Sequence, residues 1–159
     1  IFNKMSNIFQ LQTVQNIPST IETVWDFISS PRNLKIITPE FMGFDITGNI
    51  DGETMYQGMI ISYKVSPFLG LKLNWTTEIT HVKEHQYFVD EQRFGPYEFW
   101  HHKHFIKQIP NGVEMRDIID YKVGYGFIGN IANQMIVKKQ LKTIFDYRFK
   151  KIEEIFGKY

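Results

Sequence analysis

The sequence YEFWHHKHFIKQIPNGVEMRDIIDYKV, residues 97–123, decides the fold. After the central Asn111-Gly112, mostly apolar odd positions alternate with mostly polar even positions. A period of two is typical of a β-strand that buries one face. Asn-Gly between two strand-like stretches favours a two-residue type I′ turn, which places Pro110 opposite Val113. These residues therefore predict a long antiparallel hairpin.

The hairpin register predicts which side chains of its first strand face inward. Even positions of the first strand share a face with odd positions of the second strand in this register. His104 is then diagonal to Asp117, and His102 is opposite Tyr121. Two imidazoles and a carboxylate are therefore expected on the buried face of the sheet.

The inward-facing set as a whole is aromatic and apolar, with several polar groups embedded in it. The strands at 59–65 and 72–83 contribute the side chains at their odd positions, including His81. A turn of odd length at 94–96 brings the side chains at the even positions of 88–92 to the same face. A purely structural core rarely contains so many polar groups, because each needs a partner. We expect a ligand-binding set of Met59, Ile61, Tyr63, Trp75, Thr77, Phe88, Asp90, Gln92, Trp100, His102, His104, Asp117, Ile119 and Tyr121.

The rest of the chain predicts another strand and three helices. Alternation predicts a strand at 8–17. Residues 19–22 have the form of a capping box with Ser19 as the N-cap, and a second short helix begins after Ser30. From 127 to 156, apolar residues recur every three or four positions, which predicts one long amphipathic C-terminal helix with a solvated basic face.

These elements predict an α+β fold. A curved antiparallel sheet of six to seven strands would wrap around the long C-terminal helix, with two short helices after the first strand. The 22 isoleucines against a single alanine support pleated sheet over a helical bundle. Residues 1–159 fit one domain, in which we expect 1–7 to be a flexible N-terminal tail. A curved sheet that grips a helix leaves a cavity between the two.

Composition excludes several classes of protein. The net charge of +1 argues against a nucleic-acid partner, and the hydrophobic content of 43% excludes intrinsic disorder. The chain has no cysteine, so it has no disulfide and no thiolate metal site, which fits a cytoplasmic protein. No apolar run approaches the ~20 residues of a membrane span, and no signal peptide is recognisable, so we expect no membrane insertion.

The most specific motif runs from the predicted strand at 88–92, across the turn at 94–96, into the first strand of the long hairpin. It reads Asp90-x-Gln92-x-x-Gly95-Pro96-Tyr97-x-x-Trp100-x-His102-x-His104, and it is accompanied by matching stretches at 24–39, 58–63 and 75–79 and by Asp117 and Tyr121. In these residues the chain resembles the SRPBCC superfamily of START-like and polyketide cyclase/dehydrase-like helix-grip proteins. It is most similar to a bacterial subgroup labelled cell-division-inhibitor-like, and the resemblance spans residues 8–156.

The resemblance implies a helix-grip fold with a pocket for small hydrophobic molecules. It implies no single reaction, because members of the superfamily include carriers, cyclases and chaperone-associated modules. One departure from the subgroup is Gly124, where a proline is usual before the last loop. We therefore favour binding or carriage of a small hydrophobic or aromatic molecule between sheet and helix.

An enzyme of the cyclase or dehydratase type is the first alternative. A carboxylate beside an imidazole orients it and tunes its proton affinity. His104 with Asp117, assisted by His102 or Tyr121, would suit proton abstraction beside a carbonyl. A satisfied buried network that stabilises the sheet is the simpler interpretation of the same residues.

A metal site is the next possibility that the histidines raise. His102 and His104 are two residues apart on one strand face, so both reach a zinc ion if Asp117 or Asp90 is the third ligand. Two histidines on a strand are more often not ligands, so the sequence by itself predicts no metal and no cofactor.

A protein-interaction module with a closed core is the remaining alternative. The hairpin register turns Phe99 and Phe105 outward, where they would pack against a loop or another chain. We expect a monomer or a weak homodimer.

Overall fold

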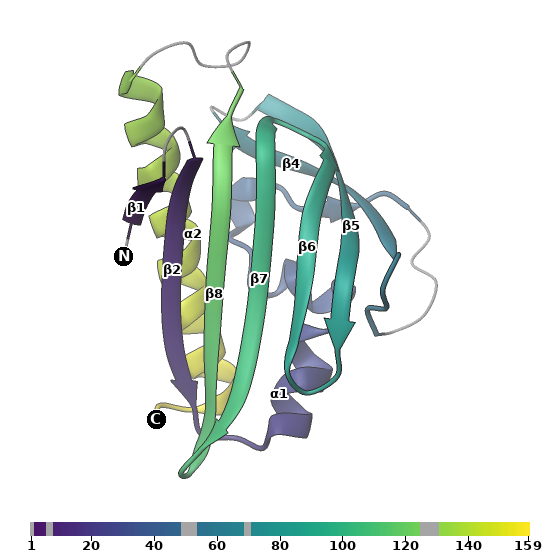
Figure 1. Cartoon of the computed structure of the whole chain (residues 1–159), viewed down its shortest axis with the longest axis vertical. Coiled ribbons are helices and arrows are strands. Elements are labelled where there is room, and N and C mark those ends of the chain that lie inside the picture. The colour runs from purple at the N-terminus through teal and green to yellow at the C-terminus, as the bar shows by residue number, and fades with distance from the viewer. Residues whose placement is uncertain (1, 6–7, 49–53, 69–70, 125–130) are drawn as a thin grey trace.

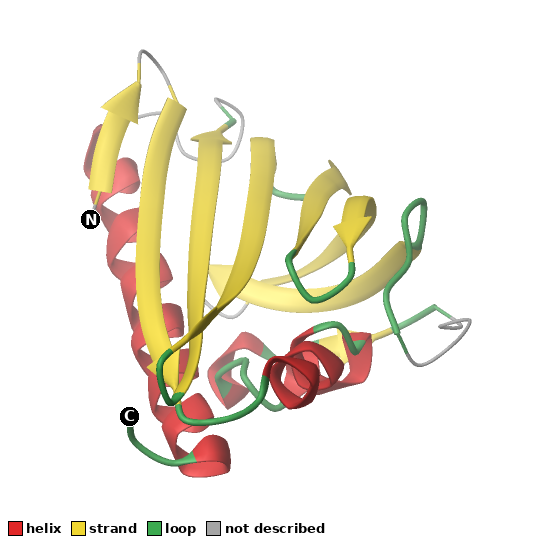
Figure 2. Cartoon of the chain, turned by 60° about the horizontal axis from the view of Figure 1, so that its bottom comes forward, coloured by secondary structure: helices red, strands yellow, loops and turns green. Residues whose placement is uncertain are grey.

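The computed structural model describes residues 2–5, 8–48, 54–68, 71–124 and 131–159. It confirms the predicted α+β architecture: a curved antiparallel sheet wraps around the C-terminal helix α2 (Ile131–Phe156), as Figures 1 and 2 show. Within these residues the sheet has eight strands in the order β1-β2-β8-β7-β6-β5-β4-β3. Their bounds are β1 Phe2–Met5, β2 Ile8–Ile17, β3 Asp45–Ile46, β4 Ile60–Phe68, β5 Leu71–Lys83, β6 Tyr87–Phe94, β7 Tyr97–Ile109 and β8 Gly112–Val123.

The two ends of the sheet extend beyond the six to seven strands expected. Residues 2–5 form β1, which pairs with β2 in antiparallel register, so the expectation of a flexible tail is wrong for these four residues. At the other edge, the two-residue β3 pairs with β4. Both edge strands are short, which limits the row of unpaired backbone groups at the edges of the sheet.

The short helices follow β2, as predicted. They are α1 (Ile21–Ile28) and two 3₁₀ turns, η1 (Pro31–Lys35) and η2 (Glu40–Met42). The N-cap of α1 is Thr20 and not Ser19, because the Thr20 hydroxyl accepts the backbone N–H of Thr23. Ser30 precedes η1 without a side-chain cap, and Pro31 supplies the fixed φ at the start of that turn.

Two hydrophobic clusters hold the helices to the concave face of the sheet. Figure 2 shows α1 and the 3₁₀ turns below the sheet, with α2 running along the left of the view behind the first strands. The stripe of α2 that faces the sheet buries Val137, Leu141, Phe145 and Ile152. The lysines of α2 lie mostly on its exposed side, as predicted. The expected helical residues 127–130 lie outside the described residues.

The hairpin between β7 and β8 differs from the prediction by two residues. Ile109 pairs with Gly112, so the turn residues are Pro110 and Asn111. Proline is common at the first position of a type II turn, and the positive φ of 61° at Asn111 is what the second position of such a turn requires. Gly112 is therefore not a turn residue, and glycine is needed there because a Cβ would lie 2.2 Å from the carbonyl oxygen of Ile17 on β2.

The corrected register changes neighbours without changing faces. His104 lies directly opposite Asp117 and not diagonal to it. Tyr121 lies opposite Trp100, and His102 has Ile119 as its partner. A shift of two residues keeps the side chains from Phe99 onward on their predicted side, whereas a shift of one would have reversed them. Tyr97 is the exception, because the register shifts between Tyr97 and Phe99 and its ring is buried at the cavity.

Strand β5 contains an irregularity that the alternation did not predict. The pairing with β6 shifts between Ile79 and His81, as at a β-bulge. Ile79 remains buried, but His81 is exposed, so the expectation that it faces inward is wrong. A bulge inserts an extra residue and reverses the alternation beyond it.

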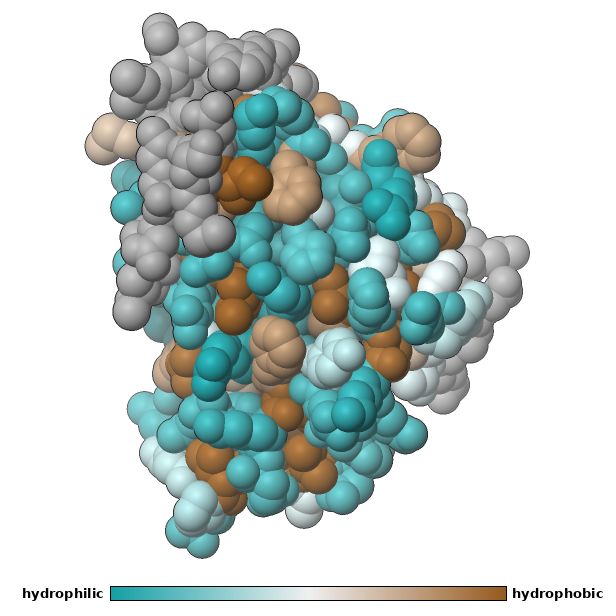
Figure 3. All heavy atoms as spheres, viewed as in Figure 1, coloured by the Kyte–Doolittle hydropathy of each residue, from teal (hydrophilic) through white to brown (hydrophobic). Residues whose placement is uncertain are grey.

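The convex face of the sheet is mostly hydrophilic, with single apolar side chains between the polar ones (Figure 3). Ion pairs cross neighbouring strands there, for example Lys103 with Asp120 at 2.7 Å and Arg93 with Glu78 at 2.5 Å. Among the described residues, no helix has both the length and the apolar character needed to cross a membrane.

Candidate functional site

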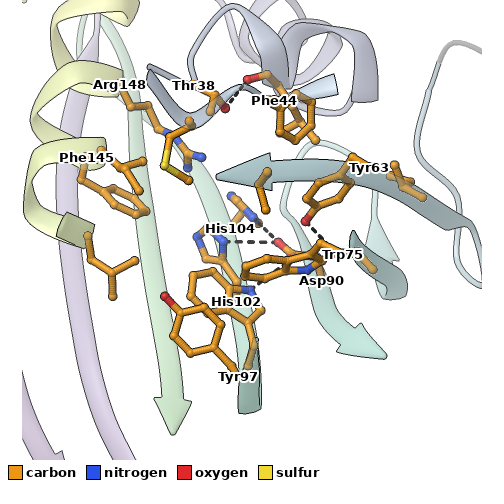
Figure 4. Close-up of a pocket in the computed structure, with 18 of the residues that line it drawn as sticks. Thr38, Phe44, Tyr63, Trp75, Asp90, Tyr97, His102, His104, Phe145 and Arg148 are labelled. Atoms are coloured by element: carbon orange, nitrogen blue, oxygen red, sulfur yellow. Dashed lines mark hydrogen bonds and ion pairs between the residues drawn. The ribbon is translucent and has the colours of Figure 1, made fainter. Parts of the chain in front are cut away.

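A cavity of about 130 Å³ lies between strands β4–β7, the 3₁₀ turns and α2. Figure 4 shows its walls, with Arg148 and Phe145 reaching in from α2 toward the sheet. Its lining is largely apolar and aromatic, with a few polar groups on the β6–β7 side, which is the usual composition of a small-molecule site.

Nine of the fourteen residues expected at the site line this cavity. They are Ile61, Tyr63, Trp75, Thr77, Phe88, Asp90, Trp100, His102 and His104. They come from four consecutive strands, β4 to β7, whose alternate side chains share the concave face.

The other five expected residues lie behind or beside the cavity wall. Met59 and Ile119 are buried in the core, and Tyr121 packs its ring against Phe9 and Tyr97. Asp117 lies behind the histidines.

Gln92 has a structural role in the turn between β6 and β7. Its amide nitrogen donates to the carbonyl of Tyr97 at 2.6 Å, and its amide oxygen accepts the Tyr97 N–H at 3.2 Å. A Cβ at Gly95 would lie 2.3 Å from that amide oxygen, so glycine leaves room for the side chain of Gln92. These contacts explain the Gln-x-x-Gly-Pro-Tyr part of the motif.

Sequence reasoning did not assign to the site the wall that the helices and loops provide, nor three further strand residues, Val65, Ile79 and Tyr97. The additional lining residues are Leu34, Thr38, Met42, Phe44, Met55, Val65, Ile79, Tyr97, Gln140, Leu141, Ile144, Phe145 and Arg148. One signal was present: Arg148 is a charged residue at a position of α2 where the helical repeat calls for an apolar one.

Four side chains form a compact polar cluster on one wall of the cavity. The His–Asp cluster consists of Asp90, His102, His104 and Asp117. Asp90 Oδ2 lies 2.8 Å from Nε2 of His104 and 3.3 Å from Nδ1 of His102. Asp117 Oδ1 lies 2.8 Å from Nδ1 of His104 and 3.0 Å from Nε2 of His102. Arg148 Nη1 lies 3.5 Å from the same Asp117 oxygen.

The strand register builds this cluster. His102 and His104 project from one face of β7, and their ring centroids are 3.7 Å apart. Asp90 pairs with His102 from β6 on one side, and Asp117 pairs with His104 from β8 on the other. Each imidazole therefore lies between two carboxylates. Both histidines are buried, at 5% and 6% exposure.

Burial and charge act in opposite directions in the His–Asp cluster. Burial by itself lowers the pKa of His104, but its hydrogen bonds to Asp117 and Asp90 and their charges raise that pKa above the ordinary value. Burial by itself raises the pKa of Asp117, but contacts with both histidines and the charge of Arg148 hold it well below its usual range. The pKa of Asp90 is likewise lowered, against the effect of burial, by the two histidines.

Aromatic rings form the remainder of the sheet-side wall. Trp75 lies at their centre: it stacks on Tyr63 at a centroid distance of 5.9 Å and meets Trp100 edge to face at 5.2 Å. Phe88 stacks on His104 at 4.1 Å. The Trp100 indole N–H donates to Asp90 Oδ1 at 3.2 Å, which joins the aromatic wall to the polar cluster.

Among the described residues, two nitrogen donors on side chains that line the cavity have no hydrogen-bond partner. They are Nε1 of Trp75 and Nε of Arg148, both buried. An unsatisfied buried donor costs on the order of 1–3 kcal/mol. A ligand with an acceptor atom within reach would remove that cost.

The arrangement suits binding better than acid–base catalysis. Both ring nitrogens of His104 face carboxylate oxygens, so neither is directed at a substrate. A general base must lie within hydrogen-bond reach of the proton that it removes. Tyr121 does not line the cavity either. The cyclase alternative thus gains no geometric support from these side chains.

Comparison with solved structures shows the fold. A protein from Rhodobacter sphaeroides matches with a TM-score of 0.69 at 13% sequence identity, covering 98% of this chain and 95% of that one. The major latex-like protein 151 from Panax ginseng matches with a TM-score of 0.65 at 13% identity, covering 95% and 99%. Ara h 8.0201 matches with a TM-score of 0.64 at 12% identity, covering 94% and 97%. No protein-family model and no curated protein matches the sequence.

Proposed function

We propose that this protein is a member of the SRPBCC superfamily and a non-catalytic carrier of a small hydrophobic molecule with an aromatic ring. The likeness to helix-grip structures and the motif from Asp90 to His104 support the membership. The observation that carries the function is the aromatic cavity with the His–Asp cluster on one wall. The absence of cysteine supports a cytoplasmic location.

The volume of the cavity sets the size of the ligand. An apolar cavity of roughly 150 Å³ takes up one benzene molecule. The cavity here is about 130 Å³, which matches a group of one aromatic ring in this conformation. A longer ligand would have to displace side chains at the α2 side of the cavity.

The unpaired donors indicate the polar part of the ligand. Trp75 Nε1 and Arg148 Nε require an acceptor, such as a carbonyl, carboxylate or phenol oxygen. The ligand is therefore expected to be apolar over most of its surface and to carry an oxygen group that one of these nitrogens can reach after a small movement of its side chain.

The test combines retained ligand with dye displacement. Protein purified from its own host without denaturation is examined by native mass spectrometry, and a polarity-sensitive fluorescent dye is displaced by aromatic carboxylates and ketones. Ile144→Trp fills the cavity from α2 and should abolish dye binding. Ile136→Trp on the same helix is the control, because Ile136 is 53% exposed and does not line the cavity. Equal dye binding by both variants, with no retained ligand, would refute the proposal.

The outward aromatic side chains support a monomer or at most a weak homodimer. Phe105 packs against Tyr87 on the neighbouring strand at 5.7 Å, and Phe99 stacks on His101 at 6.3 Å. Both rings therefore have partners within the chain. Light scattering at high protein concentration tests this proposal, and a tight dimer that Phe99→Ser dissociates would contradict it.

A further inference from the structure

We propose that Asp90, His102 and His104 form a binding site for one first-row divalent transition-metal ion, with Zn²⁺ as the reference ion. One ligand atom from each residue lies within 4.8 Å of the others, and all three residues line the cavity. Figure 4 shows Asp90 on β6 facing the two imidazoles on β7. This inference does not depend on the identity of the small-molecule ligand.

The separations of the ligand atoms fit one ion. Two atoms that each lie ~2.0–2.1 Å from a zinc ion are roughly 3 to 3.4 Å apart at right-angled to tetrahedral geometry. Asp90 Oδ2 lies 2.8 Å from His104 Nε2 and 3.3 Å from His102 Nδ1. Small movements of the side chains would place an ion among the three atoms. Two imidazoles and a carboxylate are a common protein donor set for zinc and ferrous ions.

Asp117 supplies the outer support that such a site needs. A histidine that binds a metal usually donates its other ring N–H to a carboxylate or carbonyl, which fixes the tautomer and the ring orientation. Asp117 Oδ1 lies 2.8 Å from the outer nitrogen of His104 and 3.0 Å from that of His102. Arg148 compensates the charge of Asp117, with Nη1 at 3.5 Å from the same oxygen.

The inner side of the cluster also suits a cation. In the metal-bound state each imidazole would donate its outer N–H to Asp117 and coordinate the ion through the lone pair of its inner nitrogen. The inner nitrogens of His102 and His104 both face a single carboxylate oxygen, Asp90 Oδ2. A metal ion bound at that point satisfies all three donor atoms at once. The Trp100 N–H holds the other oxygen of Asp90, which keeps Oδ2 turned toward the histidines.

The coordination would be incomplete on the cavity side. Three protein ligands leave at least one position of a tetrahedral ion for water or for an oxygen atom of a bound molecule. Because Asp90, His102 and His104 all line the cavity, that position would face the aromatic rings. A ligand oxygen there would lie next to the apolar wall formed by Trp75 and Trp100.

The test uses the full chain after removal of metals with a chelator. Zn²⁺ is titrated by calorimetry, and Co²⁺ is titrated by visible absorption, which reports nitrogen and oxygen ligands through its d–d bands. We expect one ion per chain, and no competition from excess Mg²⁺, which prefers sites made of oxygen ligands. Binding of less than one ion per chain, or equal competition by Mg²⁺, would overturn the proposal.

Variants assign the site to these residues. Asp90→Asn and His104→Gln should abolish stoichiometric binding, and Asp117→Asn should weaken it by about 10- to 100-fold as a positioning residue. His101→Gln is the matched control, because His101 lies on the same strand outside the cavity. Unchanged affinity in the first two variants would contradict the assignment.

A measurement on the wild-type chain covers the case in which those variants fail to fold. Paramagnetic Co²⁺ should shift or broaden the NMR signals of the His102 and His104 rings, which would bind it directly, far more than those of His81. His81 is exposed and does not line the cavity. Unaffected signals from His102 and His104 in the presence of stoichiometric Co²⁺ would exclude this site.

Discussion

Asp117 is the residue on which the His–Asp cluster depends most. It is 2% exposed, and its carboxylate contacts His102, His104 and Arg148. Removal of one partner from a buried ionic group leaves the others without compensation, which costs more than the loss of the contact itself. The cluster is therefore expected to be important for stability as well as for the shape of the cavity.

Asp117→Asn should lower the free energy of unfolding by about 3–5 kcal/mol, because it leaves buried cationic groups without a counter-charge. Asp146→Asn is the control: Asp146 forms an exposed pair with Lys142 on α2, so its loss should cost about 0.5 kcal/mol or less. Urea denaturation of both variants, in the presence of a chelator, measures the difference. Similar midpoints for the two variants would show that the cluster contributes little.

Tyrosine titration should make the protein less stable at high pH. Burial raises the pKa of Tyr121 to about 12 and raises those of Tyr63 and Tyr97 further. An unfolded tyrosine has a pKa of about 10, so the unfolded chain loses these protons first. The stabilising contribution is complete below that value and is lost as pH rises toward and through the folded pKa.

Unfolding experiments across this range check the prediction. The free energy of unfolding should decline from about pH 10 upward, and Tyr121→Phe should make the decline less steep. Absorbance of the phenolate form reports directly when the buried tyrosines ionise. A stability that stays constant up to pH 12, or a slope that the Tyr121→Phe variant leaves unaltered, would speak against it.

The hairpin of β7 and β8 shows which properties of an element are visible in its sequence. Alternation assigned the faces of both strands correctly except at Tyr97, which lies beyond a register irregularity, and this result survives a register error of two residues. The exact neighbours were wrong because Gly112 resembles a turn glycine. Its actual role depends on the carbonyl of Ile17, which is distant in the sequence and therefore invisible to a local pattern.

Gly112→Ala should destabilise the protein by about 1–3 kcal/mol, because the added Cβ would meet the Ile17 carbonyl oxygen at 2.2 Å. Gly124→Ala is the matched control, since its Cβ would have its nearest neighbour at 3.9 Å and should change stability by about 0.5 kcal/mol or less. Thermal unfolding of the two variants measures this. If Gly112→Ala unfolds like the wild type, β2 does not approach the turn as described.

Other features of single elements also depended on distant contacts. The bulge in β5 turns the His81 side chain to the opposite face of the sheet, and the local alternation of apolar and polar residues does not predict this bulge. The contribution of α2 to the cavity follows from the way the helix crosses the sheet, so Phe145 and Arg148 could be assigned to the helix but not to the site. Sequence patterns thus predict faces, while positions along and between elements require the tertiary structure.

For the molecule as a whole, ligand binding and stability should be coupled. A ligand that binds only the folded state raises the free energy of unfolding by about 2.7 kcal/mol at a free concentration 100 times its dissociation constant. The cavity exists only when sheet, 3₁₀ turns and α2 are assembled, so any cavity ligand should show this effect. Thermal shift assays should therefore rank ligands in the same order as dye displacement. Opposite rankings would place binding outside the cavity.

The strand order has a consequence for synthesis of the protein in the cell. β2 and β8 lie side by side (Figure 1), and the hydrogen bond between Gln10 and Asp120 joins residues 110 positions apart. The ribosome must therefore release most of the chain before β8 can insert between β2 and β7. Until then β2 keeps an exposed edge that favours aggregation. Nascent chains that end before β8 are expected to need protection by chaperones.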